Sequence, residues 1–333
     1  MAAIDRDQLN EIYIFAVQLG KDAGNMLMDA ARCRFGDAGQ TEQAIEEKDS
    51  AVDIVTKTDE AVESFIKSSI ANKYPDHKFL GEESYSKGAS RDYLIKKAAP
   101  TWCVDPLDGT VNFTHLFPMF CVSIGFILDG EAVIGVIYAP FMNQLFTACR
   151  GRGAWMNESQ PLPLVRNPVP PIPAQAPSGC VFSCEWGKDR RDSPDGNMHR
   201  KVESFVNMAA EIGGRGGKGG MVHGVRSLGS ATLDLAYTAM GAFDIWWEGG
   251  CWEWDVAAGI AILQEAGGLV TTANPPDDAD RAAIPDVRLG SRLYLAVRPA
   301  GPSPTESGRQ GQERLVREVW RRVRPLDYAR PGA

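Results

Sequence analysis

The chain has 333 residues, a length that favours two domains because a typical domain has about 150 residues. Apolar residues make up 44% of the sequence and charged residues 23%, so the chain can bury a core and is neither disordered nor fibrous. The formal net charge of −8 argues against a surface that binds nucleic acid or an anionic membrane. A negative net charge would also repel a phosphate substrate, unless a cation neutralises the site.

The ends and the cysteines predict a cytoplasmic protein without a membrane span. Charged residues crowd the first dozen positions, so no apolar stretch of an export signal can form there. The long uncharged stretch from Val111 to Leu128 contains polar residues and a proline, and it predicts a loop that leads into a strand. The seven cysteines lack paired spacing, which is typical of a reduced chain with cysteines buried as small apolar groups.

Apolar periodicity predicts helices and then strands in the first half of the chain. The predicted helices are 7–34 and 59–74, and the predicted strands are 78–80, 120–128, 132–138, 145–149 and 154–156. Asp129 and Gly130 provide a hairpin turn between two of these strands. Seven prolines between Pro161 and Pro177 cannot donate ladder hydrogen bonds, so they predict a connection between subdomains or a crossing at a sheet edge.

The second half alternates short strands with helices. We expect strands at 179–184, 269–272 and 293–297, helices at 201–212, 231–240 and 256–266, and a surface loop at 274–285. An amphipathic stripe from Leu315 to Val323 predicts a terminal helix, and docking on the domain is preferred over a tail that binds a partner.

Some short motif matches are rejected because their neighbouring residues do not suit the motif. Residues 214–219 fit the dinucleotide-binding pattern as a string, but they follow a helix and open no helix, so a flexible loop is expected. They also lack the Ser or Thr that a P-loop needs after Lys218. None of the four histidines is paired at a spacing of four, which argues against a zinc hydrolase.

The carboxylates form a more promising pattern. Asp105 and Asp108 flank a turn at the end of an apolar run, in which Pro106 fixes φ and Gly109 permits a close approach of the backbone. Such a turn can direct both carboxylates and the Leu107 carbonyl to one point.

Glu82, which follows a predicted strand, and Asp255, which opens a predicted helix, can join this pair. Carboxylate oxygens without histidine or thiolate ligands select Mg²⁺ over zinc or copper. Two Mg²⁺ ions would neutralise the four carboxylates and attract a phosphate; without them the carboxyl pKa values would rise.

Four strings in this order resemble the inositol monophosphatase family: residues 53–59, 81–84, 105–113 and 254–259. The resemblance extends over about residues 10–297. It implies a layered α/β fold, the αβαβα sandwich of the inositol monophosphatase and fructose bisphosphatase type. It also implies two or three Mg²⁺ ions, inhibition by lithium and a homodimer.

The resemblance also assigns roles to residues. It implies that Glu82, Asp105 and the Leu107 carbonyl hold a first Mg²⁺, and that Asp105, Asp108 and Asp255 hold a second. Thr110 and Asp59, with Glu82 beside them, would orient and deprotonate the attacking water, and Lys48 would lie near the phosphate or an additional metal. The implied substrate contacts are Glu82, Leu107, Asp108, Gly109, Thr110, Gly229, Ser230, Ala231, Glu248, where a sugar hydroxyl is expected, and Asp255.

The expected function is Mg²⁺-dependent hydrolysis of myo-inositol monophosphate or a similar polyol phosphate. The alternatives are hydrolysis of phosphoadenosine phosphate, fructose bisphosphate or histidinol phosphate, and a catalytically silent regulatory homologue in a quinate catabolic cluster. The indoles of Trp246, Trp247, Trp252 and Trp254 either pack in the core or reshape the substrate wall.

The expected organisation has four parts. Residues 1–160 form an α+β half with most metal ligands, and 161–178 form the proline-rich connection. Residues 179–300 form an α/β half with substrate contacts and the last metal ligand, and 301–333 form the tail.

Overall fold

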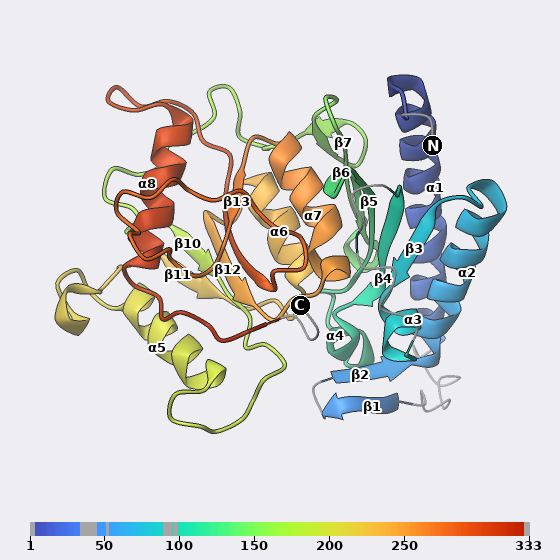
Figure 1. The fold of residues 1–333 in the computed structure, drawn as a ribbon, viewed down its shortest axis with the longest axis horizontal. Helices are drawn as coiled ribbons and strands as arrows, with labels where there is room; N and C mark the ends of the chain where they lie inside the picture. Colours follow the sequence, from blue (N-terminus) through green and yellow to red (C-terminus); the bar gives the residue numbers. More distant parts are fainter. Residues whose placement is uncertain (1–3, 34–44, 51–52, 89–94, 96–98, 330–333) are drawn as a thin grey trace. The chain divides into compact units, whose positions relative to one another are not determined.

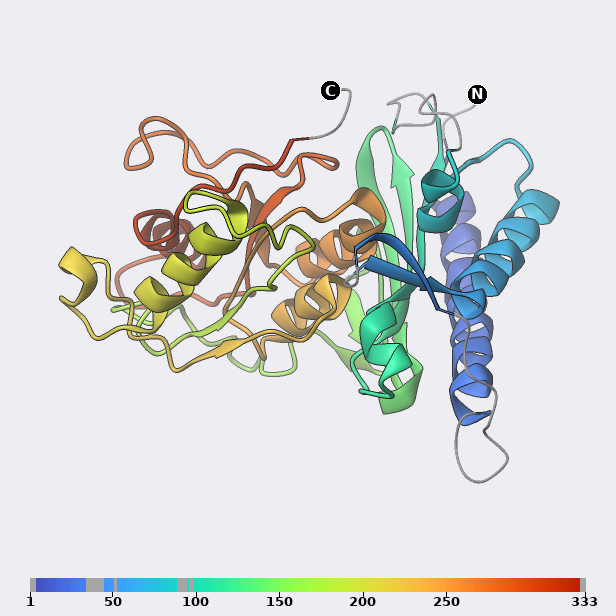
Figure 2. The ribbon, with the colours of Figure 1, turned by 90° about the horizontal axis from the view of Figure 1, so that it is seen from below.

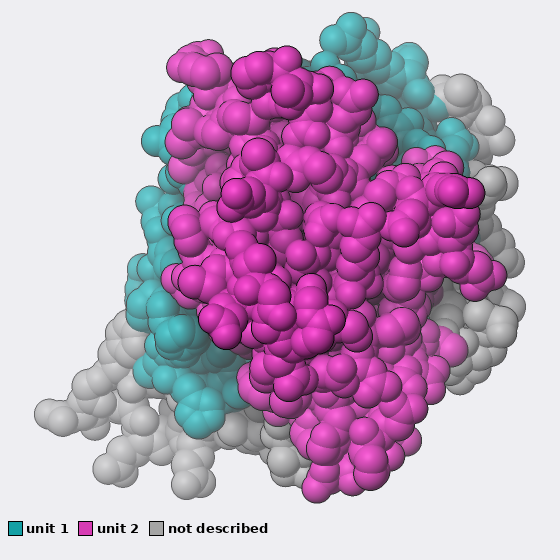
Figure 3. Space-filling view, turned by 90° about the vertical axis from the view of Figure 1, so that its left-hand side faces the viewer, with its two compact units in different colours: residues 1–161, 229–233, 253–265 teal, residues 162–228, 234–252, 266–333 magenta. Residues whose placement is uncertain are grey.

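The computed structural model describes residues 4–33, 45–50, 53–88, 95 and 99–329, without the side chains of 45–50 and 53–55. The chain divides into two compact units, which Figure 3 distinguishes by colour. Unit 1 consists of Met1–Pro161, Gly229–Leu233 and Glu253–Glu265; unit 2 consists of Leu162–Leu228, Asp234–Trp252 and Ala266–Ala333.

Unit 1 is built on a seven-stranded sheet with the strand order β3-β4-β5-β6-β7-β8-β9. The strands are β3 (Lys78–Gly81), β4 (Thr101–Asp108), β5 (Cys121–Leu128), β6 (Glu131–Ala139), β7 (Gln144–Cys149), β8 (Ala154–Met156) and β9 (Gln160–Pro161). β3 and β4 are parallel, and the other neighbours are antiparallel. The predicted hairpin turn between β5 and β6 is confirmed, since Asp129 and Gly130 both have positive φ. A separate antiparallel pair consists of β1 (Ile45–Ser50) and β2 (Asp53–Thr56).

Helices cover both faces of this sheet (Figures 1 and 2). α1 (Arg6–Arg32) and α2 (Lys57–Lys73) lie on one face, and α7 (Glu253–Glu265) lies on the other. Neighbouring residues of β6 show this division, because Val136 meets Gly20 of α1 and Gly135 meets Ala258 of α7. The single-turn helices α3 (Glu82–Ser86) and α4 (Thr110–Thr114) follow β3 and β4, and the sequence analysis did not predict them.

Gly135 allows α7 to lie directly on the sheet, and this gives a stability prediction. A Cβ atom at Gly135 would lie 2.2 Å from the carbonyl oxygen of Ala258. We therefore expect Gly135→Ala to lower the free energy of unfolding by about 2 kcal/mol or more in urea denaturation, because backbone must move. Gly151→Ala is the control, since its Cβ would enter open space and only its positive φ is strained. Equal losses for the two variants would contradict this packing argument.

Unit 2 contains a five-stranded mixed sheet with the order β11-β10-β12-β14-β13. Its strands are β10 (Val181–Ser183), β11 (Gly224–Arg226), β12 (Ile245–Gly249), β13 (Leu269–Thr271) and β14 (Leu293–Val297). α5 (Asn197–Ala209) and α8 (Gly308–Trp320) share a hydrophobic core with this sheet, which includes Phe182, Trp247 and Leu315. The predicted docking of the terminal helix is thus confirmed. α6 (Ala231–Met240) begins in unit 1 and continues into unit 2. The described part of the chain also contains the 3₁₀ turns η2 (Pro140–Met142) and η3 (Arg215–Gly217).

The division into units differs from a simple cut along the sequence. Residues 229–233 and 253–265, which we expected in the C-terminal half, belong to unit 1. The physical reason is that α7 buries an apolar face against β4, β5 and β6, although it follows β12 in the sequence. The proline-rich stretch from residue 162 onward belongs to unit 2.

The cysteines and most of the clustered tryptophans lie in the interior. Six cysteines are buried, Cys33 is exposed, and all seven are free. Trp246, Trp247 and Trp254 are buried, which agrees with core packing for these three indoles. Among the described residues, no helix has the length and apolar character that crossing a membrane requires.

Candidate metal centre

Three aspartates of unit 1 form an acidic cluster. Asp105 and Asp108 come from the end of β4, and Asp255 comes from the first turn of α7. One carboxylate oxygen from each lies within 4.8 Å of the others. β4 makes this possible through a bulge, because three steps from Asp105 to Asp108 oppose only two steps from Ser123 to Cys121 on β5. The Leu107 N–H donates to Asp105 Oδ1 (2.9 Å) and stabilises the bulge. The sequence predicted a turn between the two aspartates, whereas the structure keeps both in β4 and separates them by this bulge.

The electrostatics of the cluster favour a bound cation. Asp105 is 1% exposed, and burial together with the charges of Glu82, Asp108 and Asp255 raises its pKa well above the ordinary value. Burial also raises the pKa of Asp108 to about 6, against the hydrogen bonds that it accepts. A divalent cation would relieve this repulsion, and a donor set of carboxylate oxygens suits a hard ion such as Mg²⁺. The residues present therefore fit the metal that the sequence predicted.

Glu82 lies within electrostatic range of the cluster. It is the first residue of α3 and follows β3, which runs parallel to β4 with Gly81 opposite Val104. Parallel strands end at the same edge of a sheet, so the residues that follow them come close together. Its charge contributes to the raised pKa values of Asp59, Asp105 and Asp108.

Asp59 and Thr110 form the hydrogen-bonded pair that the resemblance implied. The Thr110 hydroxyl lies 3.1 Å from Asp59 Oδ1 and 3.0 Å from the Leu107 carbonyl oxygen, and it can donate to either. Asp59 occupies the third position of α2 and accepts hydrogen bonds from the Thr56 N–H (2.9 Å) and hydroxyl (2.5 Å), a capping box. Burial raises the pKa of Asp59 to about 6, with a further contribution from Glu82 and opposition from the Thr56 hydrogen bonds.

The predicted segment 229–231 contacts the cluster through Ser230. The Ser230 hydroxyl donates to Asp108 Oδ2 at 2.5 Å, and the Thr232 N–H donates to the same oxygen at 3.0 Å. Gly229 has φ +74°, and its carbonyl accepts a hydrogen bond from the Asn112 amide (3.4 Å). Gly109 at the start of α4 also has positive φ (+85°), so the turn that follows Asp108 requires glycine.

Two further hydrogen bonds fix the start of α7. Ser123 donates to the Trp254 carbonyl (3.1 Å), and Thr232 donates to the Asp255 carbonyl (2.8 Å). They hold the turn that presents Asp255. No motif in the sequence marked Ser123 or Thr232 as important, since their value depends on the register of β5 and on the start of α6.

Two residues that the resemblance assigned to the site belong to β1 and β12. Lys48 lies in β1, and its side chain is outside the described residues. Glu248 in unit 2 is 1% exposed and accepts hydrogen bonds from Lys201 Nζ, the Glu185 N–H (2.7 Å) and the Gly249 N–H (2.9 Å). Glu248 is thus held in a buried ion pair with Lys201, a residue that gave no signal in the sequence.

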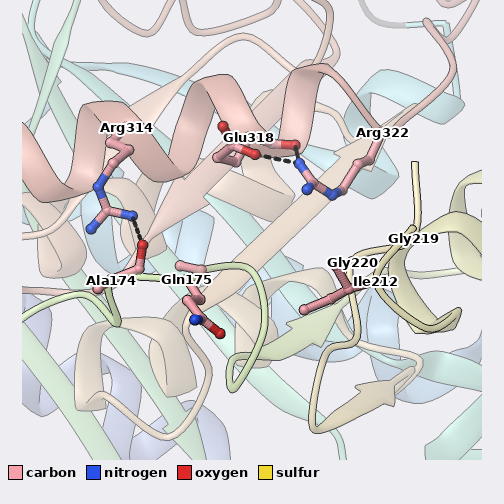
Figure 4. Close-up of a pocket in the computed structure, with 9 residues that line it drawn as sticks. Ala174, Gln175, Ile212, Gly219, Gly220, Arg314, Glu318 and Arg322 are labelled. Atoms are coloured by element: carbon pink, nitrogen blue, oxygen red, sulfur yellow. Dashed lines mark hydrogen bonds and ion pairs between the residues drawn. The ribbon is translucent and has the colours of Figure 1, made fainter. Parts of the chain in front are cut away.

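A cavity of about 380 Å³ in unit 2 is a different feature (Figure 4). Its charged walls are Arg314, Glu318 and Arg322 of α8 and the residues just after it. Glu318 forms an ion pair with Arg322 (2.5 Å), and Arg314 pairs with Glu306 (2.5 Å) and reaches the Ala174 carbonyl. Arg314 thus links α8 to the proline-rich stretch, whereas Glu318 and Arg322 pair locally, one turn apart.

The sequence pattern of the Inositol monophosphatase family matches residues 8–324, nearly the whole chain. The chain belongs to this family. The inositol monophosphatase of Anabaena (Nostoc) sp. PCC 7120 has a similar structure, with a TM-score of 0.66 and 28% identity over 96% of this chain and 98% of that chain. The predicted layered α/β fold and the resemblance to inositol monophosphatases are therefore confirmed.

Two relatives of this inositol monophosphatase family member carry different names. The "Quinic acid degradation cluster protein x" of Neurospora crassa is 73% identical over 334 residues, which cover 98% of this chain and 97% of that protein. The "Inositol monophosphatase 2" of Saccharomyces cerevisiae is 35% identical over 311 residues, which cover 92% of this chain and 96% of that protein. The family consists of metal-dependent phosphatases that act on small phosphate esters.

Proposed function

We propose that this chain is a Mg²⁺-dependent phosphatase that hydrolyses myo-inositol monophosphate to myo-inositol and orthophosphate. The observation that carries the proposal is the convergence of Asp105, Asp108 and Asp255 within 4.8 Å in a chain of this family. The identity of 35% to a yeast inositol monophosphatase supports the choice of substrate.

The acidic residues would hold the metal ions, two or three in number. Glu82, Asp105 and the Leu107 carbonyl would hold one Mg²⁺, and Asp105, Asp108 and Asp255 a second, with Lys48 near the phosphate or a third. When bound, these ions supply Lewis acidity towards the phosphoryl group and the attacking water. The hydrogen bonds from Ser230 and Thr232 orient Asp108 for this task.

Asp59 and Thr110 provide the proton acceptor. The threonine hydroxyl is a weak base, but its hydrogen bond to Asp59 Oδ1 lets it take a proton from water as it passes its own proton to Asp59. Burial raises the pKa of Asp59 above the ordinary carboxyl value, which favours its acceptance of that proton. Gly109, Gly229 and Ala231, whose backbone borders Asp108 and Ser230, would contribute substrate contacts together with Glu248.

Three further properties are proposed from the resemblance to the family. We propose inhibition by lithium, a homodimer and a cytoplasmic location for this chain. Magnesium, among the hard divalent ions, is proposed because it is the usual partner of phosphate substrates.

A phosphate-release panel tests the substrate. The full chain is assayed with inositol 1-phosphate, phosphoadenosine phosphate, fructose bisphosphate and histidinol phosphate, each with Mg²⁺ and with a chelator. We expect kcat/KM to be highest for inositol 1-phosphate and release to disappear in the chelator. A higher kcat/KM for another ester would show that this ester, and not inositol monophosphate, is the preferred substrate, while the assignment as a phosphatase would stand.

A second candidate function is supported by one observation. The 73% identical relative carries a name from quinic acid degradation, so this chain could be a catalytically silent regulatory homologue in such a cluster. The intact carboxylates of the cluster favour the enzyme. Absence of phosphate release from every ester of the panel, by a folded protein that binds Mn²⁺, would favour the regulatory homologue.

A further inference from the structure

Glu63 is a buried carboxylate of unit 1 that the proposed reaction does not use. It lies on α2, one helical turn after Asp59, and is 4% exposed. Its Oε2 accepts a hydrogen bond from the Glu83 N–H (2.7 Å), and its Oε1 accepts from the N–H (2.7 Å) and the hydroxyl (2.6 Å) of Ser84. Both carboxylate oxygens are therefore directed at α3.

The donors that Glu63 binds belong to the turn that begins with Glu82. The first N–H groups of a helix have no acceptor within the helix, and Gly81, which precedes α3, has no side chain to supply one. A helix of five residues cannot maintain its own conformation. Its orientation, and with it the direction of the Glu82 side chain, depends on contacts from other elements.

Gly81 shows how closely Glu63 approaches. A Cβ atom at position 81 would lie 2.5 Å from Glu63 Oε2 and 2.6 Å from the Phe79 ring. The backbone of Gly81 has an ordinary extended conformation, so glycine is required here for space and not for its φ angle. A side chain at position 81 would collide with the carboxylate of Glu63.

Two carboxylates of α2 therefore contact different parts of the candidate metal centre. Asp59 and Glu63 are four residues apart and share one face of the helix. Asp59 contacts Thr110, while Glu63 binds the turn that begins with Glu82. The charge of Glu82 in turn raises the pKa values of Asp59, Asp105 and Asp108. We propose that Glu63 is a positioning residue that orients Glu82 towards the acidic cluster. This rests on the proposed function, in which Glu82 is a metal ligand.

The test is a titration with Mn²⁺ of the full chain, followed by the electron paramagnetic resonance signal of free Mn²⁺. Glu63→Gln keeps the size of the side chain but turns an amide donor towards one of the two N–H groups. We expect its affinity for Mn²⁺ to fall about tenfold or more, as for other groups that orient metal ligands. The Mg²⁺ concentration at half-maximal phosphate release should rise by a similar factor, with a smaller change in KM for the ester.

Glu60→Gln is the matched control. Glu60 lies on the same helix and forms an exposed ion pair with Lys87 (2.6 Å), which follows the other end of α3. We expect its Mn²⁺ affinity to stay within about twofold of the wild type. Wild-type affinity in both variants, whatever their stabilities, would show that Glu63 is only a structural cap and would overturn the proposal.

Ser84→Ala decides the question if Glu63→Gln does not fold. It removes one of the three hydrogen bonds to Glu63, and we expect a loss of Mn²⁺ affinity of about threefold. Unchanged affinity in Ser84→Ala would overturn the proposal.

If the wild type binds no Mn²⁺, the assignment of the metal centre is wrong, and the proposed role of Glu63 is wrong with it. If the wild type binds Mn²⁺ but releases no phosphate, the proposed phosphatase function is wrong, whereas the positioning role of Glu63 is still tested by the Mn²⁺ affinities.

Discussion

Asp105→Asn is expected to reduce Mg²⁺-dependent phosphate release by at least about a thousandfold, because it removes a ligand shared by both proposed metal positions. The asparagine keeps the size of the side chain and an oxygen that can accept the Leu107 N–H, so the bulge of β4 is retained. It also removes one charge from a group of mutually repelling carboxylates. The variant should therefore fold and be at least as stable as the wild type when no divalent ion is present.

Thermal unfolding separates this expectation from a general loss of structure. Mg²⁺ should raise the Tm of the wild type, as any ligand of the native state does, and leave the Tm of Asp105→Asn almost unchanged. Asp129→Asn provides a control with the same chemical change at an exposed hairpin turn, where asparagine accommodates the positive φ. Retention of a tenth or more of the wild-type activity by Asp105→Asn would contradict the assignment of this residue.

Lys201→Met is expected to lower the free energy of unfolding by about 3–5 kcal/mol. Both partners of the ion pair are almost fully buried, and loss of the lysine leaves the Glu248 carboxylate without its counter-charge. Burial alone would lower the pKa of Lys201, but the adjacent Glu248 carboxylate more than offsets this, so the pKa is raised and the lysine stays charged. Lys201 Nζ also donates to the Glu185 carbonyl (2.8 Å), which the methionine cannot replace.

Arg309→Met measures the loss of a cation from an exposed pair. Arg309 and Glu313 are one turn apart on α8, and a pair of this kind contributes about 0–1 kcal/mol. Urea denaturation of both variants gives the comparison. A loss for Lys201→Met within about 1 kcal/mol of the loss for Arg309→Met would show that Glu248 is solvated or protonated in the native protein.

The sequence located the elements whose patterns are periodic. α1, α2 and α6 lie close to their predicted ranges because their apolar residues recur at helical spacing. Asp105 and Asp108 could be identified because Pro106 and Gly109 accompany them at the end of an apolar run, although the predicted turn is a bulge within β4. The division into units could not be predicted, since it depends on α7 packing against strands more than a hundred positions earlier.

The groups that hold the ligands in place carried weaker signals. Glu63 stands four residues after Asp59, and this spacing alone places both on one face of a helix. What it binds, the N–H groups of α3, becomes known only once the partner turn is placed. Lys201 looked like any surface lysine, because a buried cation leaves no mark in the sequence unless its carboxylate partner is known. Glu248 shows the consequence, since the resemblance assigned it a sugar contact and gave no sign of its ion pair with Lys201.

The central claim is that the acidic cluster holds divalent cations that make the chain a phosphatase. The most direct measurement is phosphate release from inositol 1-phosphate by the wild-type chain as Mg²⁺ is added to protein treated with a chelator. The account predicts no release above the uncatalysed background without the metal and a saturable rise with Mg²⁺. Release that is unaffected by the chelator, or none at any Mg²⁺ concentration, would contradict it.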